Sequence, residues 1–321
     1  MKAVVLNGIT EAKDVKLTET AKPKAVSGWV VVKIRAFGLN HSEQILRLSE
    51  IRADYIKKPI IPGIECVGEI EDASDTDFKV GQKVIALMGG MGRSFDGSYA
   101  EYALLPSDHV FAVQTEMSYE KLGAIPETFF TAWGSLFECL QLNENDTLLV
   151  RGGTCALGYA SIQIAKALGC RVVATTHRES KIRLLEDLGV DDVVIDDGNS
   201  SLRGKVKGVT KALELIGPKT VADTLSVMNK GGIVCNTGVL GKVYYLDRFD
   251  PIKDIPNGVY LTGFFSNRPT QNVVDEMMNF IIRHGIEAKI GKVFDFNDIK
   301  EAVSAQDLGK ADGKIVVTVG N

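Results

Sequence analysis

The chain has 321 residues, of which 45% are hydrophobic and 24% are charged, and it carries a net charge of −4 at pH 7. These values are typical of a soluble globular protein with two domains. The weak negative charge argues against a nucleic-acid-binding surface that covers the molecule. The most apolar stretch, residues 122–140, contains a proline and two glutamates. We therefore expect a buried or partly buried helix there, and no membrane span.

The cysteines and the first residues of the chain indicate a cellular compartment. The five cysteines are widely spaced, and none of them forms a CxxC pair. This usage favours reduced thiols in a cytosolic protein over a disulfide framework. The opening residues MKAVVLNG run directly into a strand-like pattern and lack the apolar core and cleavage site of a signal peptide. We expect a cytoplasmic protein with no membrane partner.

The first part of the chain is predicted to be rich in strands. Short apolar or alternating runs are separated there by Gly, Pro and Asp, which is the pattern of strands joined by turns. The runs lie at residues 2–6, 29–36, 66–70, 84–87 and 99–105. They predict a β-barrel in this part of the chain.

From about residue 119 to 265 the pattern changes to alternating strands and helices. Helical segments at 181–188 and 220–228 separate apolar runs near Leu148, Val172, Val193, Ala212, Ile233 and Tyr260. This alternation predicts a doubly wound parallel sheet of the α/β class. The tail then shows a helix at 271–283, a short segment at 294–296, a helix from 298 and an apolar strand at 314–319. We expect the tail to return to the first domain.

Residues 150–169, VRGGTCALGYASIQIAKALG, combine a strand, a glycine turn and a helix. Backbone N–H groups at the start of such a helix are unpaired and carry partial positive charge, which suits a dinucleotide diphosphate. The glycine fingerprint is broken, because Cys155 stands where the middle glycine is usual. The predicted cofactor-binding residues of this turn are Gly152, Gly153, Thr154, Ala156, Leu157 and Gly158.

The end of the next strand favours NADPH over NADH. No acidic residue stands at the end of this strand, where an NAD site normally presents one to the ribose 2′-hydroxyl. Instead, Thr175 and Thr176 are followed by Arg178 and Lys181, which can donate hydrogen bonds and positive charge to a 2′-phosphate. The alternative is that Arg178 and Lys181 are ordinary solvated residues of the next helix.

Several further motifs are spread along the chain in a fixed order. They are GLNHSE at 38–43, PGIECVGEI at 62–70, VGQKV at 80–84, DGSYAEY at 96–102 and TFFTAW at 128–133. Together with the glycine turn, they make the whole chain resemble the medium-chain dehydrogenase/reductase superfamily, and within it the zinc-free quinone oxidoreductases of the zeta-crystallin type. The resemblance implies a GroES-like β-barrel catalytic domain formed by residues 1–120 plus 266–321. It also implies a Rossmann NADPH-binding domain at 121–265 and an active cleft between the two.

No metal site is expected. Zinc-containing relatives carry a cysteine where this chain has Asn40 and a histidine where it has Ile64, and residues 88–102 contain no cysteine for a structural zinc. A tetrahedral zinc site needs three or four converging Cys, His or carboxylate ligands. The four histidines are isolated along the sequence, and a lone histidine is more often a packing or surface residue.

Without a Lewis acid, deprotonation of an alcohol is difficult at neutral pH, so we expect hydride transfer from NADPH to a quinone or to the β-carbon of an activated enone. Asn40 is the first candidate to donate a hydrogen bond to the acceptor oxygen or the nicotinamide ribose; the alternative is a buried turn asparagine. Glu43 is a candidate to order a water or the cofactor, or else an ordinary helix-start acid. By resemblance, Thr128 faces the nicotinamide, although it is equally suited to cap a helix.

The remaining cofactor contacts are expected at the ends of later parallel strands, where ligands of such sheets bind. They are Thr237, Gly238, Leu240, Phe264, Phe265 and Ser266. Taken singly, the two phenylalanines are more often core or dimer residues. Two departures from the resembled family concern the substrate and the cofactor: Ile45 and Asp197 each replace a tyrosine, and the carboxylate of Asp197 opposes binding of a 2′-phosphate.

Two other functions stay open. The chain is also suited to be a zinc-free alcohol or enoyl-thioester reductase, or a cofactor-binding protein with little turnover, since a fold does not determine its substrate. The expected partners are a small-molecule acceptor and a second copy of the chain, with no nucleic acid. The resemblance implies that the homodimer forms through the strand at 258–264, and an apolar edge strand is a pairing site unless it is covered.

Overall fold

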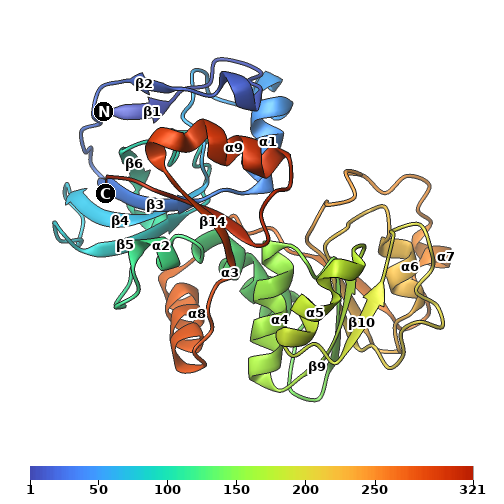
Figure 1. Ribbon diagram of the computed structural model, residues 1–321. Helices are drawn as coiled ribbons and strands as arrows, with labels where there is room; N and C mark the ends of the chain where they lie inside the picture. The colour runs from blue at the N-terminus through green and yellow to red at the C-terminus, as the bar shows by residue number, and fades with distance from the viewer. Residues whose placement is uncertain (321) are drawn as a thin grey trace. The chain divides into compact units, whose positions relative to one another are not determined.

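The computed structural model describes residues 1–320 and divides the chain into two compact units (Figure 1). The first unit comprises Met1–Glu127, Asn267–Phe280 and the chain from Glu287 onward, and the second comprises Thr128–Ser266 and Ile281–Ile286. The sequence predicts domains at 1–120 plus 266–321 and at 121–265, whereas the first unit extends seven residues further, to Glu127, and the tail segment Ile281–Ile286 belongs to the second unit.

The first unit is built on mostly antiparallel strands, as the strand-like runs of the sequence predict. A short pair, β1–β2, accompanies a larger sheet whose order is β14-β15-β3-β4-β5-β7, with β6 also paired to β3. The last strand, β15, pairs with β3 from Val316 opposite Gly38, which confirms that the tail returns to the first unit. The strands are β1 (Lys2–Val4), β2 (Leu17–Glu19), β3 (Trp29–Gly38), β4 (Glu65–Asp72), β5 (Lys83–Leu87), β6 (Tyr102–Pro106), β7 (Val110–Ala112), β14 (Ile290–Asp295) and β15 (Lys314–Thr318).

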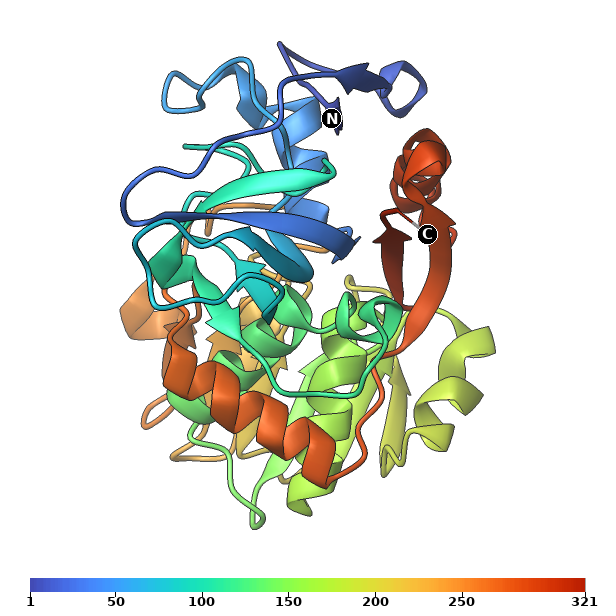
Figure 2. The same ribbon diagram turned by 90° about the vertical axis from the view of Figure 1, so that its left-hand side faces the viewer.

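Helices pack against the strands of the first unit. The C-terminal helix α9 packs against β14, β15 and the turn η1, and it appears in red beside β14 in Figures 1 and 2. Phe37, Leu46 and Ile60 are fully buried in the core that these elements enclose. The helical elements are α1 (His41–Leu48), α2 (Tyr119–Leu122), α9 (Ile299–Asp307), η1 (Ala12–Asp14), η2 (Glu50–Arg52), η3 (Ser107–His109) and η6 (Phe296–Asp298), while α8 (Gln271–Arg283) begins in the first unit and ends in the second.

The second unit is a doubly wound parallel sheet, as predicted. Its strands are β8 (Thr147–Arg151), β9 (Arg171–Thr176), β10 (Asp192–Ile195), β11 (Lys211–Glu214), β12 (Ile233–Asn236) and β13 (Tyr260–Gly263), in the order β10-β9-β8-β11-β12-β13. The chain builds outward from β8 to one side and then resumes from β11 on the other. The crevice where the strand order reverses therefore lies between the carboxyl ends of β8 and β11.

Short helices connect the strands of the second unit. Helix α4 packs on β8 and β9, α5 packs on β10, and α6 packs on β11 and β12. These elements are α4 (Ala156–Leu168), η5 (Glu179–Lys181), α5 (Ile182–Asp187), α6 (Val221–Ser226) and α7 (Pro251–Asp254).

The single helix expected over residues 122–140 is wrong. Helix α2 ends at Leu122, a new helix α3 runs over Pro126–Trp133, and a π-helix, η4, continues over Gly134–Cys139. Proline lacks the backbone N–H that a continuing helix needs and is well suited to a first helical turn, so the chain restarts there. Within residues 1–320, no helix has the length and apolar character needed to cross a membrane.

Candidate functional site: a nucleotide cradle and a buried ion network

The glycine turn of the second unit lies between β8 and α4, as the sequence predicts. The backbone N–H of Gly153 donates to the carbonyl of Thr175 over 2.9 Å, and the N–H of Gly152 donates to the Thr175 hydroxyl over 3.0 Å. A Cβ atom at Gly158 would lie 2.6 Å from the Gly153 carbonyl oxygen, so only glycine permits this approach of the helix to the turn. The turn thus presents the first N–H groups of α4 at the end of β8.

Cys155, which breaks the glycine fingerprint, caps α4. Its Sγ accepts a hydrogen bond from the N–H of Gly158 over 3.3 Å. Burial raises the pKa of this thiol, so the neutral form is favoured. Its sulfur still accepts the hydrogen bond that caps the helix. The residue that departs from the fingerprint therefore has a structural role in the turn.

Loops after three neighbouring strands meet at the switch point of the sheet. Leu215, after β11, donates from its N–H to the carbonyl of Arg151 at the end of β8 over 3.1 Å, and Leu240 donates to the carbonyl of Leu215 over 3.0 Å. The N–H groups of Thr237 and Gly238 both donate to the carbonyl of Glu214, over 3.0 and 3.1 Å. The structure thus brings the glycine turn and the predicted loop after β12 to the same edge of the sheet. The loop after β11, which connects them, was missed by the sequence reasoning.

A buried arginine holds the ends of these strands. The Arg151 side chain is 1% exposed, and its guanidinium donates to Asp196 over 2.7 Å and to Asp223 over 2.8 Å. On the adjacent strand, the buried Glu214 accepts from the N–H groups of Ile216 and Gly217 over 2.9 and 3.0 Å. Charges removed from water are stable only when they are paired in this way. Because Glu214 accepts hydrogen bonds from Ile216 and Gly217, it holds the start of the loop after β11 in place.

The end of β9 divides the four residues predicted to bind a 2′-phosphate into two groups. Thr175 and Thr176 are only 1% and 2% exposed. The Thr175 hydroxyl accepts from Gly152, as described above, and the Thr176 hydroxyl accepts from the N–H of Arg178 over 3.2 Å. These contacts give both threonines a role in shaping the turn. Arg178 is exposed, and its Nε donates to His177 Nε2 over 3.0 Å, while Lys181 closes η5.

Asp197, the acidic residue that opposes NADPH, is occupied by its own loop. Its Oδ1 accepts from the N–H groups of Asn199 and Ser200 over 2.9 and 2.8 Å. These two hydrogen bonds lower the pKa of Asp197 to about 2. The carboxylate is therefore anionic at neutral pH, and part of its charge is satisfied locally.

Asn40 and Glu43 lie together at the start of α1 in the first unit. Asn40 is the N-cap residue, and its N–H donates to Glu43 Oε2 over 2.7 Å, while Glu43 Oε1 accepts from the N–H of Ile64 over 3.1 Å. This is the reciprocal contact of a capping box. The geometry favours the alternative role of Glu43 as a helix-start acid, since both of its oxygens accept backbone N–H groups.

The Asn40 amide belongs to a buried ion network that the sequence reasoning missed. Lys314 Nζ, at the start of β15, lies 2.6 Å from Glu65 Oε1 and donates to Asn40 Oδ1 over 2.6 Å. The Asn40 amide nitrogen in turn donates to Glu65 Oε1 over 2.8 Å. The Lys314 and Glu65 side chains are 3% and 0% exposed. Asn40 is only partly buried. With both polar ends of its amide used inside this network, it nevertheless fits the turn asparagine of the alternative interpretation better than a donor to a substrate.

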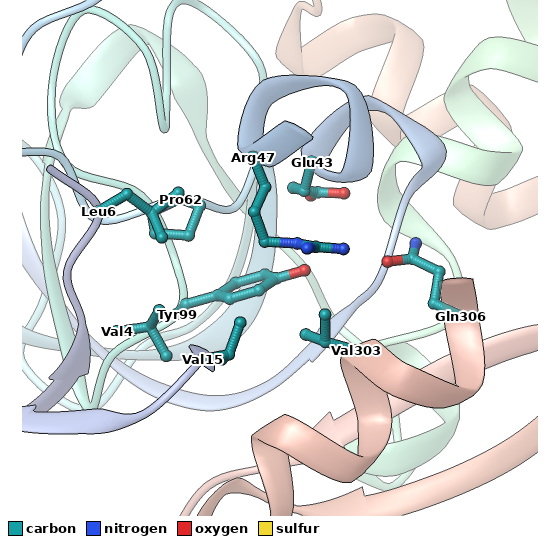
Figure 3. A pocket seen from close by; sticks show the side chains of 9 residues that line it. All are labelled: Val4, Leu6, Val15, Glu43, Arg47, Pro62, Tyr99, Val303 and Gln306. Carbon is teal, nitrogen blue, oxygen red and sulfur yellow. The ribbon is translucent and has the colours of Figure 1, made fainter. Parts of the chain in front are cut away.

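Glu43 also borders a small cavity in the first unit, with a volume of about 10 Å³ (Figure 3). Arg47 from the same helix and Tyr99 point into this cavity, and its other walls are largely apolar. Burial is the main reason that the pKa of Glu43 rises to about 7; the negative charge of Glu65 adds to the rise and Lys314 opposes it. The Glu43 carboxyl, beside the ion network, therefore changes its charge near neutral pH.

The other predicted site residues lie in the second unit. Thr128, in α3, is 8% exposed. Ser266, which follows β13, is 7% exposed. The ring centroid of the partly buried Phe264 lies 5.9 Å from that of Phe130, whereas Phe265 is 77% exposed. Their contacts with a cofactor stay a prediction. Within residues 1–320, no three His, Cys, Asp or Glu side chains converge as a metal-binding group.

Comparisons with known proteins match both parts of the chain. A family model described as an alcohol dehydrogenase GroES-like domain matches residues 26–115, and one described as a zinc-binding dehydrogenase matches residues 156–283. These matches, with the sheet order, confirm a GroES-like barrel joined to a Rossmann domain.

Individual relatives are similar over most of the chain. A quinone oxidoreductase of Mus musculus is 27% identical over 70% of this chain and 69% of its own. An acryloyl-coenzyme A reductase of Metallosphaera sedula is 27% identical over 74% of this chain and 76% of its own. A mycobacterial protein whose structure was solved in complex with NADPH has the same fold, with a TM-score of 0.85 and 21% identity over 99% of each chain.

Proposed function

The chain belongs to the medium-chain dehydrogenase/reductase superfamily and is quinone oxidoreductase-like, and on this premise we propose that it reduces a quinone or an activated enone with NADPH. Members of this superfamily are oxidoreductases that bind a nicotinamide cofactor, and that cofactor supplies the hydride. The protein's part is to hold the cofactor, orient the acceptor and stabilise the charge that develops on it.

The proposal rests on the glycine turn from Gly152 to Gly158 and the loops after β11 and β12, which together form a cradle at the switch point of the sheet. The close approach at Gly158, the turn at Gly152 and the meeting of the loops after β8, β11 and β12 fit a dinucleotide diphosphate at the start of α4. We expect Thr237, Gly238 and Leu240, on the loop after β12, to contact the cofactor as well.

The end of β9 supports the choice of NADPH. Arg178 is an exposed cation after a strand that ends without an acid, and a guanidinium pairs well with a phosphate. The local hydrogen bonds of Asp197 reduce the main objection to this choice, because they satisfy part of its charge. Lys181, the last residue of η5, is the second candidate cation.

Independence from zinc rests on the residues that replace the usual ligands. Asn40 is engaged with Lys314 and Glu65, and Ile64 is a buried apolar residue that offers no donor atom. A lysine ammonium bound at this position is incompatible with a nearby zinc ion, because the two cations repel each other. We propose that the ammonium of Lys314, and not a zinc ion, supplies the positive charge beside Asn40 and Glu65.

An enoyl-thioester reductase is the second candidate function. It is supported by the similarity to the acryloyl-coenzyme A reductase of Metallosphaera sedula, which is as identical to this chain as the quinone oxidoreductase is. Both functions deliver a hydride to an electron-poor acceptor, so they share the same cofactor site. They differ only in the acceptor.

The test is oxidation of NADPH by the purified protein with ortho-quinones, short enones and enoyl thioesters as separate acceptors. A metal chelator is included in one of each pair of assays, and NADH is run in parallel. We expect turnover with NADPH that survives chelation and is fastest with the quinones. Loss of turnover on chelation contradicts zinc independence, and turnover confined to enoyl thioesters selects the second candidate function. Tight NADPH binding with no turnover of any acceptor supports a cofactor-binding protein instead.

A further inference from the structure

Two cysteines of the second unit lie side by side although 96 positions separate them in the sequence, from Cys139 to Cys235. Cys139 ends the π-helix η4, and its Sγ donates to the Gly263 carbonyl on β13 over 3.5 Å. Cys235 lies on β12, directly opposite Thr262, the residue before Gly263. Through the Thr237 hydroxyl, Cys235 also reaches Ser135 on η4, the helix that ends at Cys139. Each thiol is close enough to the other to change its pKa.

The two thiols differ in their access to solvent. Cys235 is 0% exposed, whereas Cys139 is partly exposed. All five cysteines are free thiols. The other two in this unit are engaged elsewhere: Cys155 caps α4, and the Cys170 thiol donates to the Asn143 carbonyl over 3.1 Å. Cys139 and Cys235 therefore form a pair in which one thiol is reachable from solvent and the other lies behind it.

We propose that Cys139 and Cys235 form a modification site that hydrogen peroxide oxidises to a disulfide. The Cys139 thiolate attacks one peroxide oxygen and the O–O bond breaks, which leaves a sulfenic acid on Cys139 and releases one water after proton uptake. The Cys235 sulfur then attacks the Cys139 sulfur, the S–S bond forms, and the sulfenic oxygen leaves as a second water. The two sulfurs supply the two electrons that reduce the peroxide.

Formation of the disulfide would change a contact in the loop after β12. Cys235 Sγ lies 3.2 Å from the Thr237 hydroxyl, which in turn lies 2.9 Å from the Ser135 hydroxyl. Oxidation removes the S–H of Cys235 and turns its sulfur toward Cys139, so Thr237 loses a hydrogen-bond partner. This consequence rests on the proposed cofactor role of Thr237, whereas formation of the disulfide does not.

The chemical environment makes the site slow to react rather than hyper-reactive. Burial raises the pKa of Cys139, and burial raises that of Cys235 to about 12. Thiolates, not thiols, attack peroxides, so oxidation is faster at alkaline pH than at neutral pH. The experiment is therefore run at pH about 8.5, the usual pKa of a free cysteine.

The full-length reduced protein is treated with hydrogen peroxide, digested without reductant and mapped by mass spectrometry. We expect one peptide pair joined through Cys139 and Cys235, lighter by two hydrogens and separated by dithiothreitol. Absence of this link, with Cys139 either unmodified or oxidised to the sulfinic acid, overturns the proposal.

Single variants test the order of the two steps. With Cys235→Ser, a sulfenic acid should persist on Cys139 and be labelled by dimedone, and with Cys139→Ser, Cys235 should stay unlabelled. The matched control, Cys170→Ser, removes another cysteine of the same unit and should form the link like the unchanged protein. Labelling of Cys235 in the Cys139→Ser variant contradicts the assigned order.

NADPH titration of the reduced and oxidised protein separates this inference from the proposed function. Loss of one hydrogen bond at Thr237 should weaken NADPH binding by about fivefold, reversibly with dithiothreitol. Equal affinity of both forms overturns the coupling between the disulfide and the cofactor. A disulfide that forms in a protein with no affinity for NADPH contradicts the proposed function and leaves the modification site standing.

Discussion

A carboxyl group that changes its charge near neutral pH is buried at the start of α1. Glu43 lies among Glu65, Lys314, Arg47 and Tyr99, and burial raises its pKa to about 7. Its ordinary pKa is 4.5. A group whose pKa is higher in the folded protein binds its proton more tightly there, so it favours folding fully below the ordinary pKa. This contribution is lost as the pH rises through the raised value.

Glu43→Gln should therefore change the pH dependence of stability. From pH 4.5 to about 7, the free energy of unfolding of the unchanged protein should fall by about 3 kcal/mol relative to that of the variant. Urea unfolding of both proteins at a series of pH values measures this difference. Parallel curves for the two proteins across this interval would mean that Glu43 ionises normally.

Arg178 is the residue on which the preference for NADPH depends. Arg178→Ala should weaken NADPH binding by about tenfold or more, the effect of one charge-assisted hydrogen bond, and leave NADH binding nearly unchanged. Fluorescence titration with each cofactor measures both affinities. Lys230→Ala, which removes an exposed cation elsewhere in the same unit, serves as the control. An equal loss for both cofactors would exclude Arg178 as the 2′-phosphate ligand.

At the scale of elements, the contact between α4 and the turn after β8 is the feature that shapes the cradle. Gly158→Ala places a Cβ 2.6 Å from the Gly153 carbonyl oxygen, so the helix must shift away from the turn. We expect a loss of ~1–3 kcal/mol in stability and weaker NADPH binding, although alanine is the better helix former.

Chemical denaturation and NADPH titration measure the two effects of Gly158→Ala. Gly8→Ala is the matched control, because a Cβ there meets no atom within 4 Å, and it should change stability by less than ~0.5 kcal/mol. A Gly158→Ala protein with unchanged stability and affinity would show that the close contact does not shape the cofactor site.

The elements of the fold were largely predictable because their signals are local. The strand from Thr147, the turn at Gly152 and helix α4 follow one another within about 20 residues and carry their own apolar spacing. The restart of the helix at Pro126 was signalled by the proline, and the expectation of one helix over 122–140 gave too much weight to the apolar composition.

The ion networks were not predictable, because they depend on pairing between distant segments. Lys314 bonds to Asn40 across 274 positions of the sequence, and Arg151 bonds to Asp223 across 72. The only local signal was a charged residue at one end of an apolar strand, Arg151 at the end of β8 and Lys314 at the start of β15. For the same reason the sequence left the role of Asn40 open between a donor to the substrate or cofactor and a buried turn asparagine, whereas in the structure its amide bonds to Lys314 and Glu65.

At the scale of the whole molecule, β13 is the end strand of the parallel sheet, and we propose that it pairs with a second copy of the chain. Tyr260, its first residue, is 60% exposed. Sedimentation should give the mass of two chains for the unchanged protein, and Tyr260→Glu should shift it toward one chain because a charge on an edge strand opposes pairing. Val80→Glu, at an exposed position of the first unit, is the control. A single-chain mass for the unchanged protein would contradict the proposed dimer.

Calorimetric titration of the purified protein with NADPH and NADH measures whether the cradle of the second unit binds NADPH. We expect one site per chain, with NADPH bound at least about tenfold more tightly than NADH, which corresponds to roughly 1.4 kcal/mol. Binding of neither cofactor, or tighter binding of NADH, would contradict this expectation.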